Sequence, residues 1–455
     1  MRSAEDLTDG SVRKHLIRLT IPMFLGISSM IVASMIDTIY IGWIGTRELA
    51  AVSFSFPVVM GLASMSMGLG VGATSIMARA IGSGNRDASF TLATHTLVLV
   101  VLLVVTLGVG GWFAGPWLFT RMGADAVLLP LVLDYMDIWF FGLPLFAAPM
   151  VAMNMLRAAG SARTPGVLMS FGAVLQVVIA PALIFGIPGL VDGMGYLGSA
   201  WAFVASRAVT AVITVVVLNN RGMFRPMVSV SAMLVSWREV LRIGVPSMLT
   251  NLIAPVSMSV AFWFLADHGH AVVAAFGIAV RIESLALMIL MSLSSSMSVL
   301  VGQNWGKRQY SRIREGLSLS YRFSFAWGVF ALALLGGLGA QIVGLINDNP
   351  DVIAATHDYL LIVPLSYALL GVSMMAGSCF IALGRPMPSL VLSIGRMLVL
   401  FVPLAWLGDA WWGYRGVFVA NALSNVIVAI VGYLWVTRTV PLNQPDGEPA
   451  DPAPV

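Results

Sequence analysis

The sequence predicts an all-α integral membrane protein with twelve transmembrane helices in two pseudo-symmetric six-helix bundles. The chain of 455 residues is 58% hydrophobic and only 10% charged, whereas a soluble domain has about 25% charged residues. Apolar runs of about 20 residues, the length that crosses a bilayer, recur from end to end. The second half of the chain also repeats short motifs of the first half in the same order. These observations exclude an ordinary soluble enzyme.

Twelve apolar runs, each bounded by Gly, Pro or charged residues, mark the expected spans. A polar tail (1–15) precedes the first run, which is too long for the h-region of a cleavable signal peptide. The spans are expected at 17–43, 50–80, 92–114, 131–156, 165–187, 194–218, 240–265, 272–303, 318–346, 356–382, 387–407 and 412–437.

The basic residues predict the orientation of the chain in the membrane. Most of the 25 Lys and Arg residues lie in the tails or in the loops after even-numbered spans, whereas the opposite loops hold only Arg47, Arg121 and Arg415. Because cytoplasmic loops are enriched in Lys and Arg, we expect an inner-membrane protein with both termini in the cytoplasm. The basic pI near 9.4 then reflects topology, and no nucleic-acid partner is expected.

An internal duplication predicts the domain organisation. The segment LIRLTIP recurs as VLRIGVP, which pairs Pro22 with Pro246, and the same offset of 224 residues pairs Gly82 with Gly306. Six spans per repeat give both halves the same orientation, so we expect a repeat axis along the membrane normal and a cavity between the halves. The expected parts are a cytoplasmic tail (1–15), an N-lobe (16–218), a cytoplasmic linker (219–236), a C-lobe (237–438) and a disordered cytoplasmic tail (439–455).

Asp37 is the leading candidate for the working residue. It is the only acid in the first half of the chain that lies well within a span, and an acid in hydrocarbon costs about 2.5 kcal/mol or more. Such residues carry protons, coordinate cations or neutralise a partner. Asp37 aligns with Ala261 in the second repeat, whereas Arg281 aligns with Pro57. The two halves are therefore expected to share a scaffold but not a chemistry.

Several motifs resemble those of the multidrug and toxic compound extrusion (MATE) family, and the likeness covers nearly all of the chain. They are IRLTIP, MIDTIYIGWIG, ARAIGSGNRD, NMLRAAGSARTP, MGYLGSAWA and VGQNWGKRQ. The resemblance implies an antiporter that exports amphipathic, often cationic compounds with a proton or sodium gradient, and it implies that Asp37 is the cation-coupling residue of the N-lobe. The additional acids of NorM-like members in helices 7 and 10 are not found, so the chain is more similar to DinF-like members.

The coupling ion is expected to be a proton. Where DinF-like members often carry an Asn and an Asp in helix 5, this chain has Gln176 and Ala180. Sodium needs several oxygen ligands, and Asp37 with Gln176, Ser34 and Thr38 forms a small set, whereas a proton needs one carboxylate. Backbone carbonyls could complete a sodium site, so that alternative stays open. Protonation of Asp37 is expected to release substrate, with helix 1 bending near Pro22 or Gly26.

Further residues are expected to line the substrate cavity, because methionine adapts to varied apolar shapes and a buried arginine can bind a carboxylate. The additional cavity candidates are Met65, Met67, Met150, Met153, Asn154, Arg281, Met288 and Met291.

The sequence also bounds the alternatives. It has no GxxxxGK[ST] loop for ATP and no His/Cys cluster, so we expect no enzyme activity, cofactor or metal site. Two other transporters remain open: a sodium-coupled MATE exporter and a flippase of lipid-linked precursors from the same superfamily. A channel or structural membrane protein would tolerate loss of the Asp37 carboxylate. We expect a monomer in the lipid bilayer that exports small amphipathic molecules.

Overall fold

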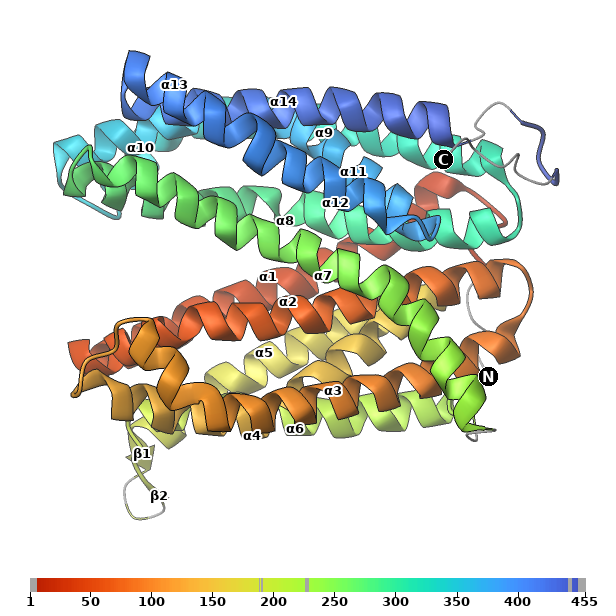
Figure 1. Cartoon of the computed structure of the whole chain (residues 1–455), viewed down its shortest axis with the longest axis horizontal. Helices are drawn as coiled ribbons and strands as arrows, with labels where there is room; N and C mark the ends of the chain where they lie inside the picture. The colour runs from red at the N-terminus through yellow and green to blue at the C-terminus, as the bar shows by residue number, and fades with distance from the viewer. Residues whose placement is uncertain (1–5, 188, 190, 226–228, 441–443, 449–455) are drawn as a thin grey trace. The chain divides into compact units, whose positions relative to one another are not determined.

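The computed structural model describes residues 6–187, 189, 191–225, 229–440 and 444–448. Within these residues, twelve helices are long and apolar enough to cross a membrane, as the sequence predicts. The first six are α1 (Val12–Ile44), α2 (Thr46–Gly82), α3 (Arg86–Arg121), α4 (Leu128–Ala158), α5 (Arg163–Ile184) and α6 (Tyr196–Asn220) (Figure 1). A two-residue antiparallel ladder that the sequence did not predict, β1 (Gly186–Ile187) with β2 (Val191–Asp192), connects α5 to α6.

The second six spans include two that are interrupted. Uninterrupted spans are α7 (Val230–Ala266), α8 (His270–Gly306), α9 (Tyr310–Gly344) and α14 (Tyr414–Thr439). The tenth span consists of α10 (Pro350–Ile362), the 3₁₀ segment η1 (Val363–Ser366) and α11 (Tyr367–Ala382), and the eleventh of α12 (Pro386–Ile394), the π segment η2 (Gly395–Phe401) and α13 (Val402–Trp412). Such interruptions often mark functional positions.

The start of α7 differs most from the expected spans. We expected the helix to begin at 240 after a polar linker, but it begins at Val230. Its first turns pack on α3: the Ser236 hydroxyl lies 2.9 Å from His95 Nδ1, and Trp237 Nε1 donates to the His95 carbonyl at 2.7 Å. The start of this helix was not predicted because hydropathy identifies helices by their apolar residues. Its early turns are held by hydrogen bonds as well as by apolar contacts.

Contacts divide the chain into two compact units. Among the described residues, unit 1 contains those in 21–77 and 85–248, and unit 2 contains those in 6–20, 78–84 and 249–448. The chain therefore passes from one unit to the other inside α1, α2 and α7, an arrangement that we call the helix exchange. The lobe limits expected from the repeat remain a prediction.

In unit 1, α4 packs against α3 and α6, and α6 also packs against α5. The core between α4 and α6 is aromatic: Trp139 and Phe203 are stacked with ring centroids 4.1 Å apart, and Tyr135, Met136 and Phe140 are buried beside them. Aromatic pairs of this kind add stability beyond the burial of their area. This core fixes α4 relative to α6.

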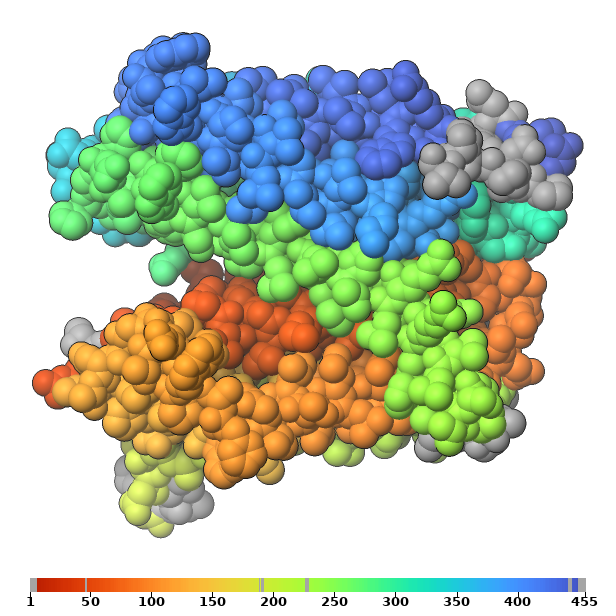
Figure 2. Space-filling model, viewed as in Figure 1, coloured from red at the N-terminus to blue at the C-terminus, as the bar shows by residue number. Residues whose placement is uncertain are grey.

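In unit 2, α11 packs against α8, α9 and α14. The outward faces of α13 and α14 form part of the surface in Figure 2, and Trp406, Trp411 and Trp412 of α13 are each more than 60% exposed. Exposed tryptophans near the end of a span are typical of the membrane interface. Unit 2 therefore presents apolar side chains outward, as a lipid-facing bundle requires.

Two glycines of unit 2 that the repeat pairs with each other permit the ends of α2 and α8 to meet. A Cβ atom on Gly306 would lie 2.2 Å from the Arg79 carbonyl oxygen, and one on Gly82 would lie 1.9 Å from the Gln303 carbonyl oxygen. Both clashes are with backbone atoms, which cannot rotate away. This explains why the repeat has glycine at both positions.

Replacing Gly306 by Ala should therefore destabilise unit 2 by about 1–3 kcal/mol, the usual range for overpacking. The matched control is Gly277→Ala on the same helix, because a Cβ atom there would have no neighbour within 4 Å. Thermal unfolding in detergent should show a lower midpoint for Gly306→Ala only. Equal midpoints for the two variants would contradict the close approach.

Part of the tail that we expected to be disordered makes defined contacts. Ser311 donates from its backbone N–H to Asp446 Oδ1 at 2.9 Å and from its hydroxyl to Asp446 Oδ2, and the Tyr310 hydroxyl donates to the Glu448 carbonyl at 2.9 Å. Burial raises the pKa of Asp446, but the hydrogen bonds from Ser311 and the Tyr310 backbone, together with the charge of Arg314, hold that pKa below its usual value. The tail residues 441–443 and 449–455 lie outside the described residues.

Candidate functional site

The carboxylate of Asp37 is held by a partner that the sequence analysis did not identify. Asp37 lies on α1 and is half-buried. The hydroxyl of Ser199, which is only 1% exposed, lies 2.9 Å from Asp37 Oδ1 and 2.8 Å from Oδ2. The hydroxyl therefore donates to the carboxylate. A buried charge-assisted bond of this kind positions the acid inside the bundle.

Tyr135 of α4 completes the group around the acid. It is 5% exposed, and it interacts electrostatically with Asp37 and also with Ser199. Its ring stacks on that of Tyr196 with centroids 6.5 Å apart. Three spans, α1, α4 and α6, thus contribute one polar side chain each to the group that we call the Asp37 centre: Asp37, Ser199 and Tyr135.

Local sequence explains how Ser199 reaches this position. Gly195 has a φ of 60° where the chain enters α6, in the left-handed region that favours glycine. A Cβ atom on Gly198 would lie 2.4 Å from the Leu183 carbonyl oxygen, so only glycine permits α6 to approach α5 this closely. The motif GYLGS therefore sets the entry of α6, and Ser199 follows in its first turn.

The polar residues expected around Asp37 are arranged differently. The Thr38 hydroxyl is exposed and donates to the Ser34 carbonyl of its own helix at 2.9 Å, and Ser34 is also exposed. Gln176 of α5 is buried, with 7% of its surface exposed. Among the described residues, the hydrogen bonds to the Asp37 carboxylate come from Ser199.

The remaining cavity candidates are dispersed over both units. Asn154 is buried and links α4 to α2, because its side chain donates to the Met150 carbonyl at 3.1 Å and its own carbonyl accepts from Thr74 at 3.2 Å. Arg281 is exposed on α8. The methionines range from buried (Met153, Met288) through half-buried (Met65, Met150) to exposed (Met67, Met291).

The expected bend of α1 lies where this helix touches α5. A Cβ atom on Gly26 would lie 3.1–3.2 Å from atoms of Met169 and Gly166, and one on Gly166 would lie 2.3 Å from the Pro22 carbonyl oxygen. Pro22 also lies next to the 20/21 boundary of the helix exchange. Both hinge candidates therefore lie at a close helix contact, and Pro22 lies one residue beyond the point where α1 changes unit.

Unit 2 contains a half-buried acid of its own, Glu283 of α8. The Tyr359 hydroxyl of α10 donates to Glu283 Oε2 of α8 at 2.6 Å. Tyr359 is the repeat partner of Tyr135, because 224 residues separate them. Both tyrosines thus lie near an acid. In unit 1 the acid is Asp37 of α1, and in unit 2 it is Glu283 of α8.

A cation in the interrupted spans accompanies this acid. Arg396, in the π segment η2, interacts electrostatically with Glu283, and its guanidinium donates to Asn425 Oδ1 of α14 at 2.9 Å. Asn425 Nδ2 in turn donates to the Ser366 hydroxyl in the 3₁₀ segment η1 at 3.1 Å. We call Glu283, Tyr359, Arg396, Asn425 and Ser366 the Glu283 network. The interruptions of the tenth and eleventh spans therefore coincide with a polar network of buried and half-buried residues.

Comparison with known proteins identifies the family. The MatE family model matches residues 22–182 and 246–407, one match in each half of the chain. The chain is 32% identical over 441 residues to an FAD transporter of Shewanella oneidensis, covering 96% of this chain and 97% of that protein. It is 24% identical to the probable multidrug resistance protein YpnP of Bacillus subtilis, covering 95% and 96% of the two chains.

A solved structure agrees with the fold. A mutant of the MATE transporter VcmN of Vibrio cholerae superposes with a TM-score of 0.90 at 25% identity, covering 95% of this chain and 98% of that one. The paired family matches, the twelve spans and this similarity together show that the chain belongs to the MatE family of multidrug efflux transporters and is not an enzyme.

Proposed function

We propose that this protein is a proton-coupled antiporter that exports amphipathic, often cationic compounds, and that Asp37 is its proton-binding residue. The observation that supports this most is the Asp37 centre, a carboxylate within a span that accepts a hydrogen bond from a buried hydroxyl. Intramembrane acids that face a protein interior are usually functional. The family membership makes transport the relevant function.

The proposed mechanism is competition between proton and substrate. Ionised Asp37 accepts the hydrogen bond from Ser199 and attracts a cationic substrate. Once protonated, the carboxyl group loses its charge and one of its oxygens becomes a donor, which can donate to the Ser199 hydroxyl. This change releases the substrate, and α1 transmits it to the contact of Pro22 and Gly26 with Gly166. One inward proton carries about 2.3 kcal/mol per 100 mV, which corresponds to about fifty-fold accumulation of an uncharged substrate.

Proton coupling is favoured over sodium coupling by the arrangement of oxygen atoms. A sodium ion needs several oxygen ligands in one place. The Thr38 and Ser34 side chains are exposed, and among the described residues the hydrogen bonds to the Asp37 carboxylate come from Ser199 alone. A single carboxylate with a hydroxyl partner suits a proton better.

We also propose that the protein is a DinF-like monomer in the inner membrane with both termini in the cytoplasm.

The coupling ion can be tested in vesicles that contain the purified protein. An imposed pH gradient should drive dye transport, whereas a sodium gradient at fixed pH and potential should leave the rate unchanged. A sodium gradient that drives transport without a pH gradient would contradict proton coupling. Vesicles reconstituted with the Asp37→Asn variant serve as the control for leak.

A second substrate class, FAD and related dinucleotides, is favoured by the 32% identity to a protein described as an FAD transporter. FAD is anionic, so an ionised Asp37 would repel it instead of attracting it. The same vesicles can be loaded with FAD: gradient-driven FAD movement without dye movement would select this substrate over the cationic class. Movement of lipid-linked precursors across the bilayer, with neither dye nor FAD transport, would instead select the flippase alternative.

A further inference from the structure

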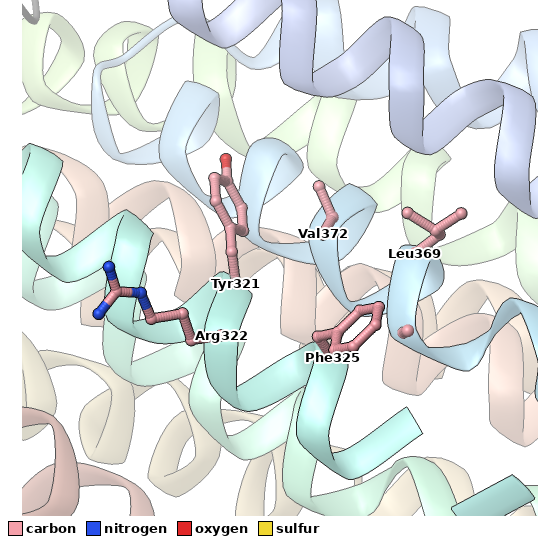
Figure 3. Close-up of a pocket in the computed structure, with 6 residues that line it drawn as sticks. Tyr321, Arg322, Phe325, Leu369 and Val372 are labelled. Carbon is pink, nitrogen blue, oxygen red and sulfur yellow. The ribbon is translucent and has the colours of Figure 1, made fainter. Parts of the chain in front are cut away.

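An open groove runs between α9 and α11 in unit 2. It has a volume of about 530 Å³ and is lined by Tyr321, Arg322 and Phe325 of α9 and by Ala368, Leu369 and Val372 of α11 (Figure 3). The two helices touch beside the groove, because a Cβ atom on Gly328 would lie 2.4 Å from the Ala368 backbone nitrogen. The groove is therefore a consequence of a tight helix crossing between small residues.

The lining combines one cation with an apolar surface. Arg322 is the only charged residue of the lining, and Phe325 is 64% exposed. In Figure 3 the Arg322 guanidinium lies at one end of the group, directed away from Leu369 and Val372. The groove thus has a charged end and an apolar end, as an amphipathic occupant requires.

Arg322 differs from the other basic residues near the start of α9. It is exposed, and no hydrogen bond or ion pair joins it to another residue in the described part of the chain. Arg312 of the same helix, by contrast, donates to Asn304 Oδ1 at 2.9 Å and to the Gly10 carbonyl at 2.7 Å. The repeat pairs Arg322 with Val98, 224 residues earlier, so the scaffold itself does not require a cation here.

The position of Arg322 along the helix matches the depth of lipid phosphates. The residues that follow it in α9, 323–344, carry no charge. These 22 residues span about 33 Å at 1.5 Å per residue, close to the roughly 30 Å thickness of the hydrocarbon core. Arg322 therefore lies at the boundary with the headgroups, and Phe325 lies about one turn further into the hydrocarbon.

We propose that this groove binds one anionic phospholipid, with the lipid phosphate on the Arg322 guanidinium and one acyl chain along Phe325, Leu369 and Val372. Arginine binds phosphate through charge-assisted hydrogen bonds, and the phosphate supplies the partner that the protein does not. The acyl chain covers apolar side chains that α9 and α11 leave open. The occupant is a membrane lipid, because the groove lies between membrane-spanning helices and its lining is apolar apart from Arg322 and the Tyr321 hydroxyl.

The test measures binding of phosphatidylglycerol and phosphatidylcholine with identical acyl chains to the delipidated full-length protein in detergent, by native mass spectrometry. The wild type should prefer phosphatidylglycerol. Arg322→Gln should bind phosphatidylglycerol about fivefold more weakly, the effect expected for one basic residue at a lipid surface, and Arg322→Lys should retain most of the preference. The matched control is Arg438→Gln, because Arg438 is an exposed arginine in the last turn of α14 that does not line the groove.

Two further measurements distinguish binding of a lipid from binding of a free anion, and binding in the groove from attraction to the Arg322 charge alone. Val372→Phe fills the apolar end and keeps Arg322, so phosphatidylglycerol binding should weaken while the protein remains folded. Inorganic phosphate alone should not compete with the lipid. Equal phosphatidylglycerol binding by Arg322→Gln and Arg438→Gln, unchanged binding by Val372→Phe, or full competition by inorganic phosphate would each overturn the proposal. None of these measurements depends on transport or on the coupling ion.

Discussion

Replacing Asp37 by Asn is expected to abolish gradient-driven export while the protein is still made and inserted. Asparagine has nearly the same volume and can still accept a hydrogen bond from Ser199, so the packing of α1 on α6 should survive. It cannot take up or release a proton, and so the roughly fifty-fold accumulation that 100 mV supports should disappear. Dye efflux from bacteria that lack other exporters, together with the amount of protein in the membrane, measures both quantities.

The matched control for this variant is Asp134→Asn. Asp134 lies beside Tyr135 on α4, but it is exposed. The same change of charge in the same unit should therefore leave export near the wild-type level. Normal efflux by Asp37→Asn would refute the assignment of Asp37 as the proton-binding residue. Loss of efflux in both variants would mean that export requires the total negative charge of unit 1 and not Asp37 in particular.

Removing the cation of the Glu283 network should produce a large loss of stability. Arg396→Met leaves Glu283 without its positive partner and Asn425 without its donor. Leaving a buried hydrogen-bonding group without its partner costs about 1–3 kcal/mol, and Glu283 also loses a nearby positive charge. The free energy of unfolding in mixed micelles should fall by about this amount. Arg281→Met is the control, because Arg281 is exposed and surface substitutions change stability by about 0.5 kcal/mol or less.

A double-mutant cycle tests whether Arg396 acts through Glu283. Glu283→Gln removes the carboxylate charge and retains a group that can accept from Tyr359. If the two charges stabilise each other, the double variant should be more stable than the sum of the single effects predicts, by about 1 kcal/mol or more. An additive double variant would mean that Arg396 stabilises unit 2 through Asn425 alone.

The sequence could predict the twelve spans and Asp37, because both depend on signals that lie along the chain. Length and hydropathy identify a span, and a lone acid inside one is visible without coordinates. Ser199 lies in the motif MGYLGSAWA, but its contact with Asp37 depends on the rotation of α6 about its axis. That rotation is set by the close approach of Gly198 to Leu183, which no local pattern reveals.

The Glu283 network shows a different limit of prediction from the sequence. Aligning the repeats compares residues in equivalent positions, and the position equivalent to Asp37 holds Ala261. The second acid comes from another helix and reaches the tyrosine that corresponds to Tyr135. Two repeats can therefore keep an acid near the equivalent tyrosine while moving the acid to a different helix. Only the packing of helices in space makes this correspondence visible.

The helix exchange has a mechanical consequence. The chain changes unit within α1, α2 and α7, whereas its return to unit 1 at 84/85 lies in the turn between α2 and α3. At the three crossings inside helices, no loop can absorb a displacement of one unit relative to the other. Any reorientation must deform hydrogen-bonded helix backbone, and α1 and α7 each carry a proline, Pro22 or Pro246, within two residues of the crossing. Prolines weaken a helix locally, so the strain should concentrate at these two positions. One of them, Pro22, lies on α1, the helix that carries Asp37.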